Sequence, residues 1–303
     1  MFYRIKRQTA TAWYCFRTRD IFKTAPLRCD PRGPAVLVSQ LCHRDLAMYL
    51  LAVKSLGRYV CPSMVYVLDD TTLTESDKGI LRRHIQPVEI LPITSVKNPV
   101  CPKGGTWERL LFILDLVAAS YVIQLDSDTL TLRVPSSVQH HMTHGVSFTL
   151  GEWAGQKIVS ARESAALVTK EVERGSVHVQ MVSEASLHLL TGADRLKYVR
   201  GCSGFVGFAK GSFARSAAEN FSQQMATIVG EQKWSEWGSE QVTSNFIVAN
   251  SANAAVLPFP EYCYHGPQVD FMAATFVHFI GSYRFHAGSY ARLGRQVIGG
   301  LPR

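Results

Sequence analysis

Two aspartates separated by one residue follow a short apolar run near the middle of the chain. The run is Tyr121-Val-Ile-Gln-Leu125, and the pair is Asp126 and Asp128. Residues i and i+2 of an extended segment point to the same side, so both carboxylates can face one ion. Hard oxygen ligands with open positions suit Mg²⁺ or Mn²⁺ that also contacts a diphosphate. The pattern predicts a divalent-metal site; the other interpretation is a solvated loop with two acidic residues.

The position of this pair discriminates between two enzyme classes. Haloacid-dehalogenase-type phosphatases carry D-x-D-G-T near the start of the domain, whereas here Thr129 follows Asp128 without a glycine. Sugar-nucleotide-dependent glycosyltransferases place the pair in mid-domain, after a half that binds the nucleotide. The position favours the glycosyltransferases.

Strands and helices alternate before the pair, which predicts an α/β fold with a mostly parallel central sheet flanked by helices. Beyond residue 135 the alternation fades. We expect strands at 35–39, 64–68, 88–91, 121–125 and 201–208, and helices at 45–56, 74–84, 107–118, 157–174, 212–229 and 239–249.

Four segments, in order, resemble GT-A fold glycosyltransferases, particularly the family 8 (glycogenin- and galactosyltransferase-like) group. They are M-V-Y-V-L-D-D-T-T-L-T-E (64–75), W-E-R-L-L-F-I-L-D-L-V-A-A-S-Y-V-I-Q-L-D-S-D-T-L-T-L (107–132), G-C-S-G-F-V-G-F (201–208) and V-H-F-I-G-S-Y-R (277–284). The last is similar to the family's H-F-x-G-x-x-K, with Arg284 in place of lysine. The resemblance covers about residues 36–285 and implies the GT-A (nucleotide-diphospho-sugar transferase) fold.

The resemblance also implies a donor and metal site. Asp126, Asp128 and His278 would bind Mn²⁺ or Mg²⁺, and Arg284 would pair with the donor diphosphate. Arg109 would lie near the donor nucleotide, and Ser39 would reach its base or ribose. For His278 the other interpretation is a core histidine, for Arg284 an exposed tail residue, and for Arg109 a solvated helix charge.

Further residues are implied near the reacting sugar. Ser203 and Gly204 lie in the strand expected beneath it, and Glu240-Gln241 resembles the family's Asp-Gln pair. If the enzyme inverts, a carboxylate here would be the general base; if it retains, Glu240 or Gln241 would stabilise an oxocarbenium-like transition state.

Two aromatic clusters stay outside this scheme. Histidines 140, 141 and 144 lack the glutamate of H-E-x-x-H and fall in an expected loop, so we interpret them as a surface cluster. Trp234 and Trp237 would either stack on an acceptor sugar or simply pack.

Composition and charge exclude several classes of protein. Of the 303 residues, 47% are hydrophobic, which excludes a disordered chain. No C-x-x-C pair occurs among the seven cysteines and no run of about 18 apolar residues is present, so we expect a protein of the cytoplasm without a spanning helix. The formal charge of +8 gathers at the two ends of the chain, which disfavours a nucleic-acid partner.

The charge also suggests how the chain is divided. We expect a basic, aromatic N-terminal arm and linker at 1–34, one GT-A domain at 35–288 and a basic tail at 289–303. Arginines interleaved with aromatics at 1–23 suit the inner face of an anionic membrane, or else the arm packs on its own domain.

These observations lead us to expect a metal-dependent glycosyltransferase. It would move a sugar from a nucleoside diphosphate donor, UDP by default, to a hydroxyl of a glycan or a lipid-linked acceptor, including cell-surface glycans. The alternatives are a sugar-phosphate nucleotidyltransferase and a non-catalytic nucleotide-sugar-binding protein of the same fold. The nucleotidyltransferase would need a glycine-rich loop after the first strand, and Gln40-Leu-Cys-His-Arg-Asp45 has no glycine.

Overall fold

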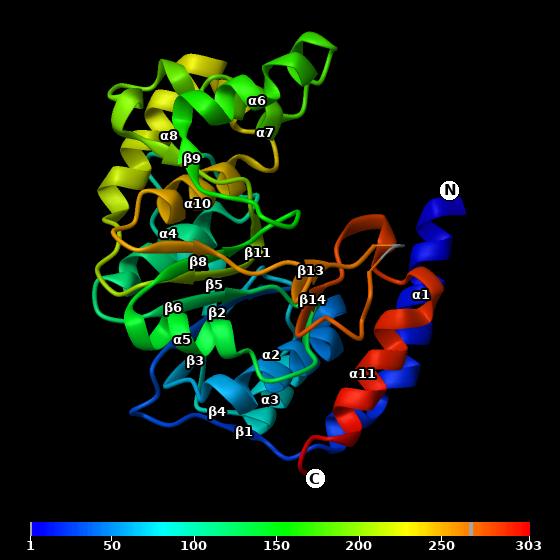
Figure 1. Ribbon diagram of the computed structural model, residues 1–303. Helices are drawn as coiled ribbons and strands as arrows, with labels where there is room; N and C mark the ends of the chain where they lie inside the picture. Colours follow the sequence, from blue (N-terminus) through cyan, green and yellow to red (C-terminus); the bar gives the residue numbers. More distant parts are fainter. Residues whose placement is uncertain (1, 267–268) are drawn as a thin grey trace. The chain divides into compact units, whose positions relative to one another are not determined.

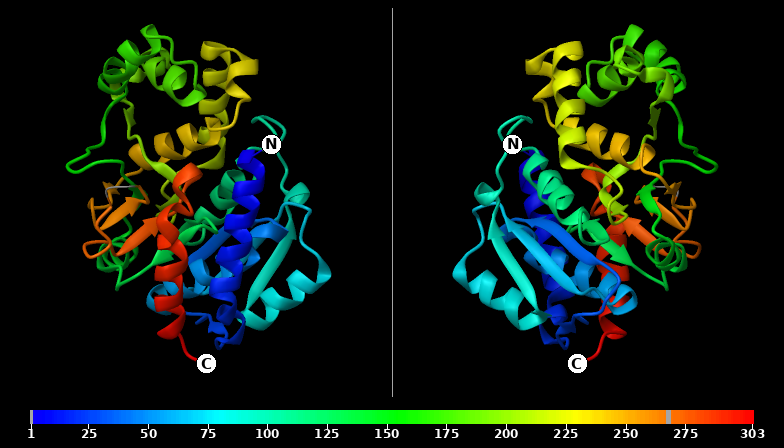
Figure 2. Two further views of the ribbon diagram at one scale, coloured as in Figure 1. Left: turned by 90° about the vertical axis from the view of Figure 1, so that its right-hand side faces the viewer. Right: turned by 90° about the vertical axis from the view of Figure 1, so that its left-hand side faces the viewer.

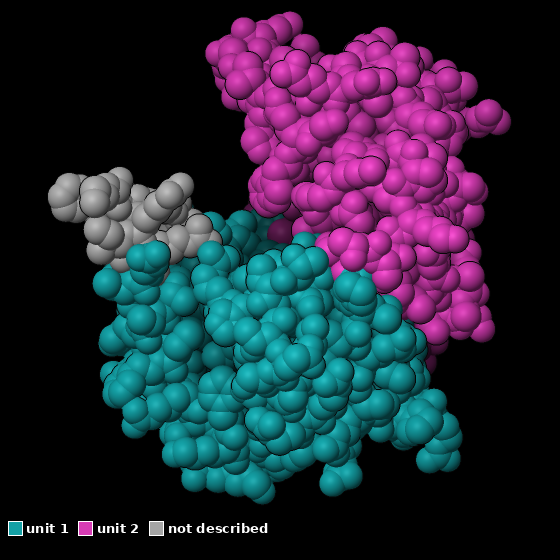
Figure 3. Space-filling model, turned by 180° about the vertical axis from the view of Figure 1, so that it is seen from behind, with its two compact units in different colours: residues 1–92, 125–139, 259–303 teal, residues 93–124, 140–258 magenta. Residues whose placement is uncertain are grey.

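The chain has a mixed α/β fold (Figure 1). The computed structural model describes residues 2–266 and 269–303, with the backbone alone for residues 2–7 and 282. Two compact units are distinguished in Figure 3: unit 1 comprises residues 1–92, 125–139 and 259–303, and unit 2 comprises 93–124 and 140–258. Among the described residues, every helix is too short or too polar to cross a bilayer.

Unit 1 begins with a parallel strand–helix alternation. Its elements are β2 (Val36–Leu41), α2 (Leu46–Val60), β3 (Met64–Asp69), α3 (Glu75–His84) and β5 (Val88–Pro92). The strand order is β2-β3-β5, with Leu37 opposite Val65 and Val67 opposite Ile90. Strand β2 is almost continuously buried, which is the pattern of a parallel strand covered on both faces. The expected strands and crossover helices of this half are confirmed, with boundaries shifted by up to four residues.

A second, smaller sheet of unit 1 brings distant parts of the sequence together. It contains β7 (Thr129–Thr131), β13 (Tyr262–Tyr264) and β14 (Phe276–His278). Strand β14 runs antiparallel to β7, with His278 directly opposite Thr129. This register places a residue from near the end of the chain beside the D-x-D segment.

The two ends of the chain form paired helices in unit 1. Helix α1 (Phe2–Thr18) lies along α11 (Ser289–Gly299) in both Figure 1 and Figure 2. Tyr14 and Tyr290 are both fully buried, with ring centroids 4.3 Å apart. The segment 289–303, expected as a basic tail, is therefore mostly a packed amphipathic helix.

Unit 2 combines short strands of two sheets with several helices; β9 and β10 pair with each other alone. Its strands are β6 (Val122–Leu125, whose last residue belongs to unit 1), β8 (Ser147–Leu150), β9 (Val159–Ser160), β10 (Lys197–Tyr198), β11 (Cys202–Phe208) and β12 (Ala254–Val256). Its helices are α4 (Trp107–Val117), α6 (Ala161–Glu173), α7 (Val179–Ala185), α8 (Arg215–Val229), α9 (Glu231–Trp234) and α10 (Ser239–Ala249). Strand β8 pairs antiparallel with β11 and parallel with β12.

The glycines around β11 serve this sheet packing. A Cβ atom on Gly201 would overlap the side chain of Thr149, and one on Gly207 would overlap the ring of Phe148. Both positions therefore require glycine so that β8 and its side chains can approach β11 closely.

One local prediction is wrong. The histidines at 140, 141 and 144 lie on helix α5 (Ser136–His144) and not in a loop. The rings of His140 and His144 stack with centroids 4.0 Å apart, as residues i and i+4 of a helix do.

Candidate functional site

The D-x-D segment forms a tight turn at the start of β7. The hydroxyl of Thr129 donates to the carbonyl oxygen of Asp126 at 2.9 Å and closes the turn. The backbone N–H of Phe279 donates to the carbonyl oxygen of Asp128 at 2.8 Å. These bonds fix the turn against β14, so the two carboxylates and His278 are held by backbone pairing.

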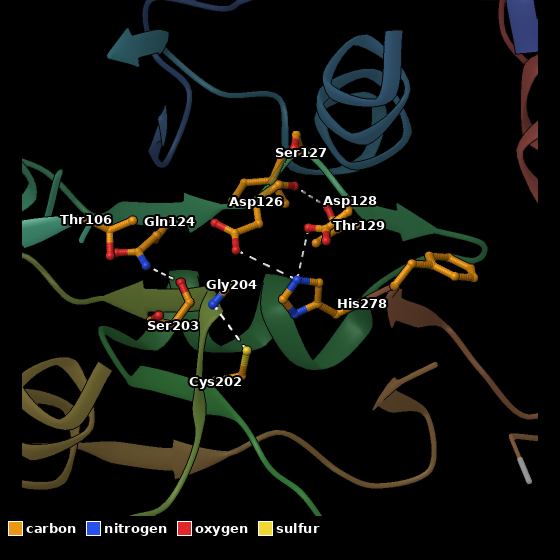
Figure 4. A network of polar contacts seen from close by, with 12 residues as sticks. Thr106, Gln124, Asp126, Ser127, Asp128, Thr129, Cys202, Ser203, Gly204 and His278 are labelled. Carbon is orange, nitrogen blue, oxygen red and sulfur yellow. Dashed lines mark hydrogen bonds and ion pairs between the residues drawn. The ribbon is translucent and has the colours of Figure 1, made fainter. Parts of the chain in front are cut away.

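Asp126, Asp128 and His278 converge on one point (Figure 4). Their ligand atoms all lie within 4.8 Å of one another. The His278 Nε2 atom lies 3.0 Å from Oδ1 of Asp128 and 3.7 Å from Oδ2 of Asp126. Asp128 and His278 are buried, whereas the Asp126 side chain is 30% exposed. The site is thus open to solvent on the Asp126 side.

Arg284 completes this cluster. Its Nη2 group pairs with Oδ2 of Asp128, and its Nε–H donates to the carbonyl oxygen of Phe279 at 3.1 Å. Burial by itself would raise the pKa of the Asp128 carboxyl, but the charges and hydrogen bonds of His278 and Arg284 outweigh it and hold that pKa below its ordinary value. Asp128 is therefore an anion between two nitrogen groups.

A residue of helix α11, Tyr290, contacts the D-x-D turn and the residue that follows β14. The Tyr290 hydroxyl approaches the carbonyl oxygen of Ser127 at 3.4 Å, and its ring stacks on Phe279 with centroids 4.1 Å apart. Tyr290 was not singled out from the sequence because it lies in the segment interpreted as a tail. Its helical spacing with Leu293 and Val297 was the available signal.

The Ser39 side chain lies in the interior of unit 1. It is fully buried in β2, and its hydroxyl donates to the carbonyl oxygen of Leu125 at 2.7 Å. The bond ties β2 to the residue that precedes Asp126. This hydroxyl therefore supports the D-x-D turn and does not face solvent.

The other candidate residues belong to unit 2, where Arg109 and Glu240 form a buried pair. Arg109 Nη2 lies 3.8 Å from Glu240 Oε1, and the two side chains are 3% and 2% exposed. The hydroxyl of Thr106 donates to Glu240 Oε2 at 2.8 Å. Glu240 lies in the first turn of α10, where a negative charge is favoured by the helix dipole.

Gln241, the next residue, contacts the glycine-containing strand. The Ser203 N–H donates to Gln241 Oε1 at 3.2 Å, and the Ser203 hydroxyl lies 3.4 Å from the same oxygen. The Gln124 amide donates to the Ser203 carbonyl oxygen, and the Gly204 N–H points to the sulfur of Cys202 at 3.4 Å (Figure 4). The structure thus brings Ser203, Gly204 and Gln241 together at β11.

A network that the sequence did not reveal extends from Gln241. Its amide donates to Gln180 Oε1 at 3.1 Å, and Gln180 donates to Glu184 Oε1 at 2.9 Å. The same Glu184 oxygen accepts the Tyr198 hydroxyl at 3.0 Å, and Arg200 pairs with Oε2. Glu184 is 1% exposed, but as one acidic residue on a short helix it gave no sequence signal.

The two tryptophans differ in environment. Trp234 is buried, and its Nε1–H donates to the Ser222 hydroxyl at 2.8 Å, so of the two interpretations packing is confirmed for this residue. Trp237 is 74% exposed.

Comparison with known proteins identifies the fold. No protein-family model and no curated protein sequence matches the chain. Among solved structures, the bifunctional glycosyltransferase WbbM is similar, with a TM-score of 0.50 and 10% identity. The match covers 89% of this chain and 50% of WbbM, so the chain spans about half the length of that protein. The galactosyltransferase LgtC matches with a TM-score of 0.45, 11% identity and coverage of 88% of this chain and 96% of LgtC. GlyE of Streptococcus pneumoniae TIGR4 matches with a TM-score of 0.46 and 12% identity, over 87% of this chain and 62% of GlyE.

At these identities the likeness concerns the fold. The chain shares the GT-A fold with WbbM, with a mostly parallel sheet flanked by helices, and the fold expected from the sequence is confirmed.

Proposed function

We propose that the protein is a metal-dependent GT-A glycosyltransferase that moves a sugar from a nucleoside diphosphate, UDP in the first instance, to an acceptor hydroxyl. The observation that carries the proposal is the convergence of Asp126, Asp128 and His278 in a chain of GT-A fold. The proposed relation to family 8 rests on the four sequence segments described above.

The three side chains fit a divalent cation. Two carboxylates and one imidazole, held by backbone pairing with one open side, form the oxygen-rich donor set that suits Mn²⁺ or Mg²⁺. When bound, such an ion stabilises the negative charge of a departing diphosphate. Asp126, Asp128 and His278 would hold it, and Arg284 would neutralise a second part of the diphosphate.

The unit 2 residues would act on the donor and its sugar. Arg109 would contact the nucleotide, and Ser203 and Gly204 would line the sugar. Gln241 is hydrogen-bonded to Ser203 and to Gln180, which fix its orientation. Its amide dipole would therefore already be oriented to stabilise the charge that develops at the anomeric carbon of the donor sugar. Glu240 would act as general base in an inverting reaction.

The acceptor is proposed to be a glycan or a lipid-linked sugar at the inner face of the membrane. Support comes from α1, where Trp13 and Phe16 are exposed and lie under the guanidinium groups of Arg17 and Arg19. Exposed aromatic and arginine pairs are suited to a headgroup region. The first part of this segment, residues 1–7, lies outside the described side chains.

The test is donor turnover. Release of UDP from a panel of UDP-sugars, with simple hexose acceptors and Mn²⁺, is expected in the wild type and should fall to background with a chelator. Asp126→Asn removes a ligand at the exposed side of the site and should abolish turnover. Asp115→Asn, which changes an exposed carboxylate elsewhere, should retain it.

Two results would replace the proposal. Metal-dependent UDP binding without turnover of any donor would identify a nucleotide-sugar-binding protein. Pyrophosphate release from UTP and a sugar 1-phosphate would identify a nucleotidyltransferase.

A further inference from the structure

A pocket in unit 1 is separate from the D-x-D turn. It has a volume of about 240 Å³ and lies between the end of α2, the residues that follow β7, the segment around Phe271 and one face of α11. Its wall contains three arginines, Arg58, Arg133 and Arg292, and apolar side chains that include Phe271 and Met272.

The three arginines share this pocket without a carboxylate in its wall. Among the described residues, none of the three forms an ion pair with an acidic side chain. Arg58 Nη1 donates to the Gly300 carbonyl oxygen at 3.4 Å, and Arg133 donates to the Ala274 carbonyl oxygen. The Arg58 Nε–H is buried and has no acceptor among the described residues.

Arg58 is half-buried, and the other buried or half-buried arginines whose side chains the structure describes are neutralised. Arg109 has Glu240, Arg200 has Glu184 and Arg284 has Asp128. Three uncompensated guanidinium groups at one pocket repel one another, and a bound anion would remove that repulsion. Guanidinium groups bind phosphate oxygens with two parallel hydrogen bonds, which makes a phosphate group the matching anion.

Apart from Gln296 and Gly300, the rest of the wall is apolar, and part of it is open to solvent. Met272 is 81% exposed, and the ring of Phe271 has the Arg292 guanidinium 6.0 Å from its centroid. The carboxylate of Asp270 accepts the Met272 backbone N–H at 2.8 Å and holds this turn. A phosphate that carries hydrocarbon would use both kinds of wall, whereas inorganic phosphate would use only the arginines.

We propose that this pocket binds the headgroup phosphate of an anionic phospholipid, with Phe271 and Met272 in contact with its acyl region. The proposal does not depend on glycosyl transfer, because the pocket residues are distinct from those of the D-x-D site. It would hold unit 1 at a bilayer surface through a defined site and not only through the overall basic charge.

The test compares binding to vesicles of phosphatidylcholine with binding to vesicles of phosphatidylcholine and phosphatidylglycerol, measured by co-sedimentation. The wild type should bind the mixed vesicles preferentially. Arg292→Gln and Arg133→Gln should each weaken this binding about fivefold, from the ~1 kcal/mol that one basic residue contributes at an anionic surface. Met272→Gln should weaken it without changing the charge.

Arg295→Gln is the matched control. Arg295 is exposed on the same helix and does not line the pocket, so its replacement should weaken binding clearly less than Arg292→Gln. Equal losses for the two variants would show that diffuse charge, and not the pocket, binds the membrane, and would overturn the proposal. So would equal binding to both kinds of vesicle.

A soluble probe separates the two sources of phosphate. Dihexanoyl phosphatidylglycerol below its micelle concentration should raise the melting temperature of the wild type, and Arg133→Gln/Arg292→Gln should reduce this shift. An equal shift with inorganic phosphate would contradict the lipid assignment. Both arginines are exposed, so the variants should melt as the wild type does without ligand.

Discussion

The buried Arg109–Glu240 pair shows how a single residue can serve stability and the proposed chemistry together. Both side chains are almost fully buried, and each charge is compensated by the other. Removing one partner of a buried pair leaves a desolvated charge, which costs more than the pair itself contributes. Glu240, the candidate base implied by the motif resemblance, is therefore also sensitive to substitution because it is buried.

Glu240→Ala is expected to lower the free energy of unfolding by about 3–5 kcal/mol, because the Arg109 charge would stay buried without its carboxylate. Glu236→Ala is the control: Glu236 pairs with Lys233 at the surface, and such pairs contribute about 0–1 kcal/mol. Urea denaturation measures both. Equal, small losses would show that the carboxylate of Glu240 is solvated.

At the level of elements, the start of α3 was readable from the sequence. Thr74 and Asp77, three residues apart, form a capping box: the Asp77 N–H donates to the Thr74 hydroxyl at 3.2 Å, and the Thr74 N–H donates to the Asp77 carboxylate at 2.8 Å. Thr74→Ala should reduce the free energy of unfolding by about 1 kcal/mol. Ser76→Ala, in the same exposed turn but outside the box, should be neutral or slightly stabilising; an equal loss there would contradict the capping role.

A buried lysine of α2, Lys54, connects the segment before β2 with α2 and with the end of α3. The buried Lys54 ammonium donates to the Thr24 hydroxyl, the Ala25 carbonyl oxygen and His84 Nδ1, each at 2.8 Å. Burial, together with the Lys54 charge, lowers the pKa of His84 to about 4. His84 therefore stays neutral in the folded protein where an unfolded histidine takes up a proton.

The free energy of unfolding should consequently fall as the pH is lowered from about 6.5 toward 4, since the unfolded chain binds the additional proton in this range. His84→Gln keeps an acceptor for Lys54 and should show a shallower fall, measured by urea denaturation at several pH values. His188→Gln, at an exposed site, controls for the loss of one histidine. Identical pH profiles for the wild type and His84→Gln would contradict this account.

The sequence predicted the long elements well and the short ones poorly. Helix α4 and strand β3 carry enough apolar positions to show their period, and both were found nearly to the residue. Strands β7, β8 and β14 have three or four residues, which are too few to show an alternation of apolar and polar positions. Strand β14 nevertheless contains the site residue His278. That placement came from the resemblance of a motif, because pairing between residues 129 and 278 leaves no local trace.

The site was predictable to the same degree. Asp126 and Asp128 could be found from spacing after an apolar run, whereas the Glu184 network and Tyr290 depend on packing between separate elements. Helix α11 was missed because the four arginines between Phe279 and Arg303, two of them in α11, drew attention to the charge of this segment. Its buried face of Tyr290, Leu293 and Val297 has helical spacing.

At the scale of the whole molecule, both ends of the chain are part of unit 1. Helix α11 covers Tyr14 of α1 and carries Tyr290, which contacts the D-x-D turn. Deleting residues 289–303 should therefore lower the melting temperature and weaken Mn²⁺ binding. Deleting only the exposed Arg303 is the control, and unchanged Mn²⁺ affinity in the longer truncation would contradict the support role of α11.

The measurement that tests the central claim most directly is the melting temperature with UDP, with and without Mn²⁺, in the wild type and in Asp126→Asn. A ligand at 100 times its dissociation constant adds about 2.7 kcal/mol to the free energy of unfolding, which is readily observed as a shift. We predict that UDP stabilises the wild type only when Mn²⁺ is present, and that Asp126→Asn loses this shift while melting normally without ligand. A UDP shift that is equal without Mn²⁺, or that persists in Asp126→Asn, would contradict a metal-bridged donor site at Asp126, Asp128 and His278.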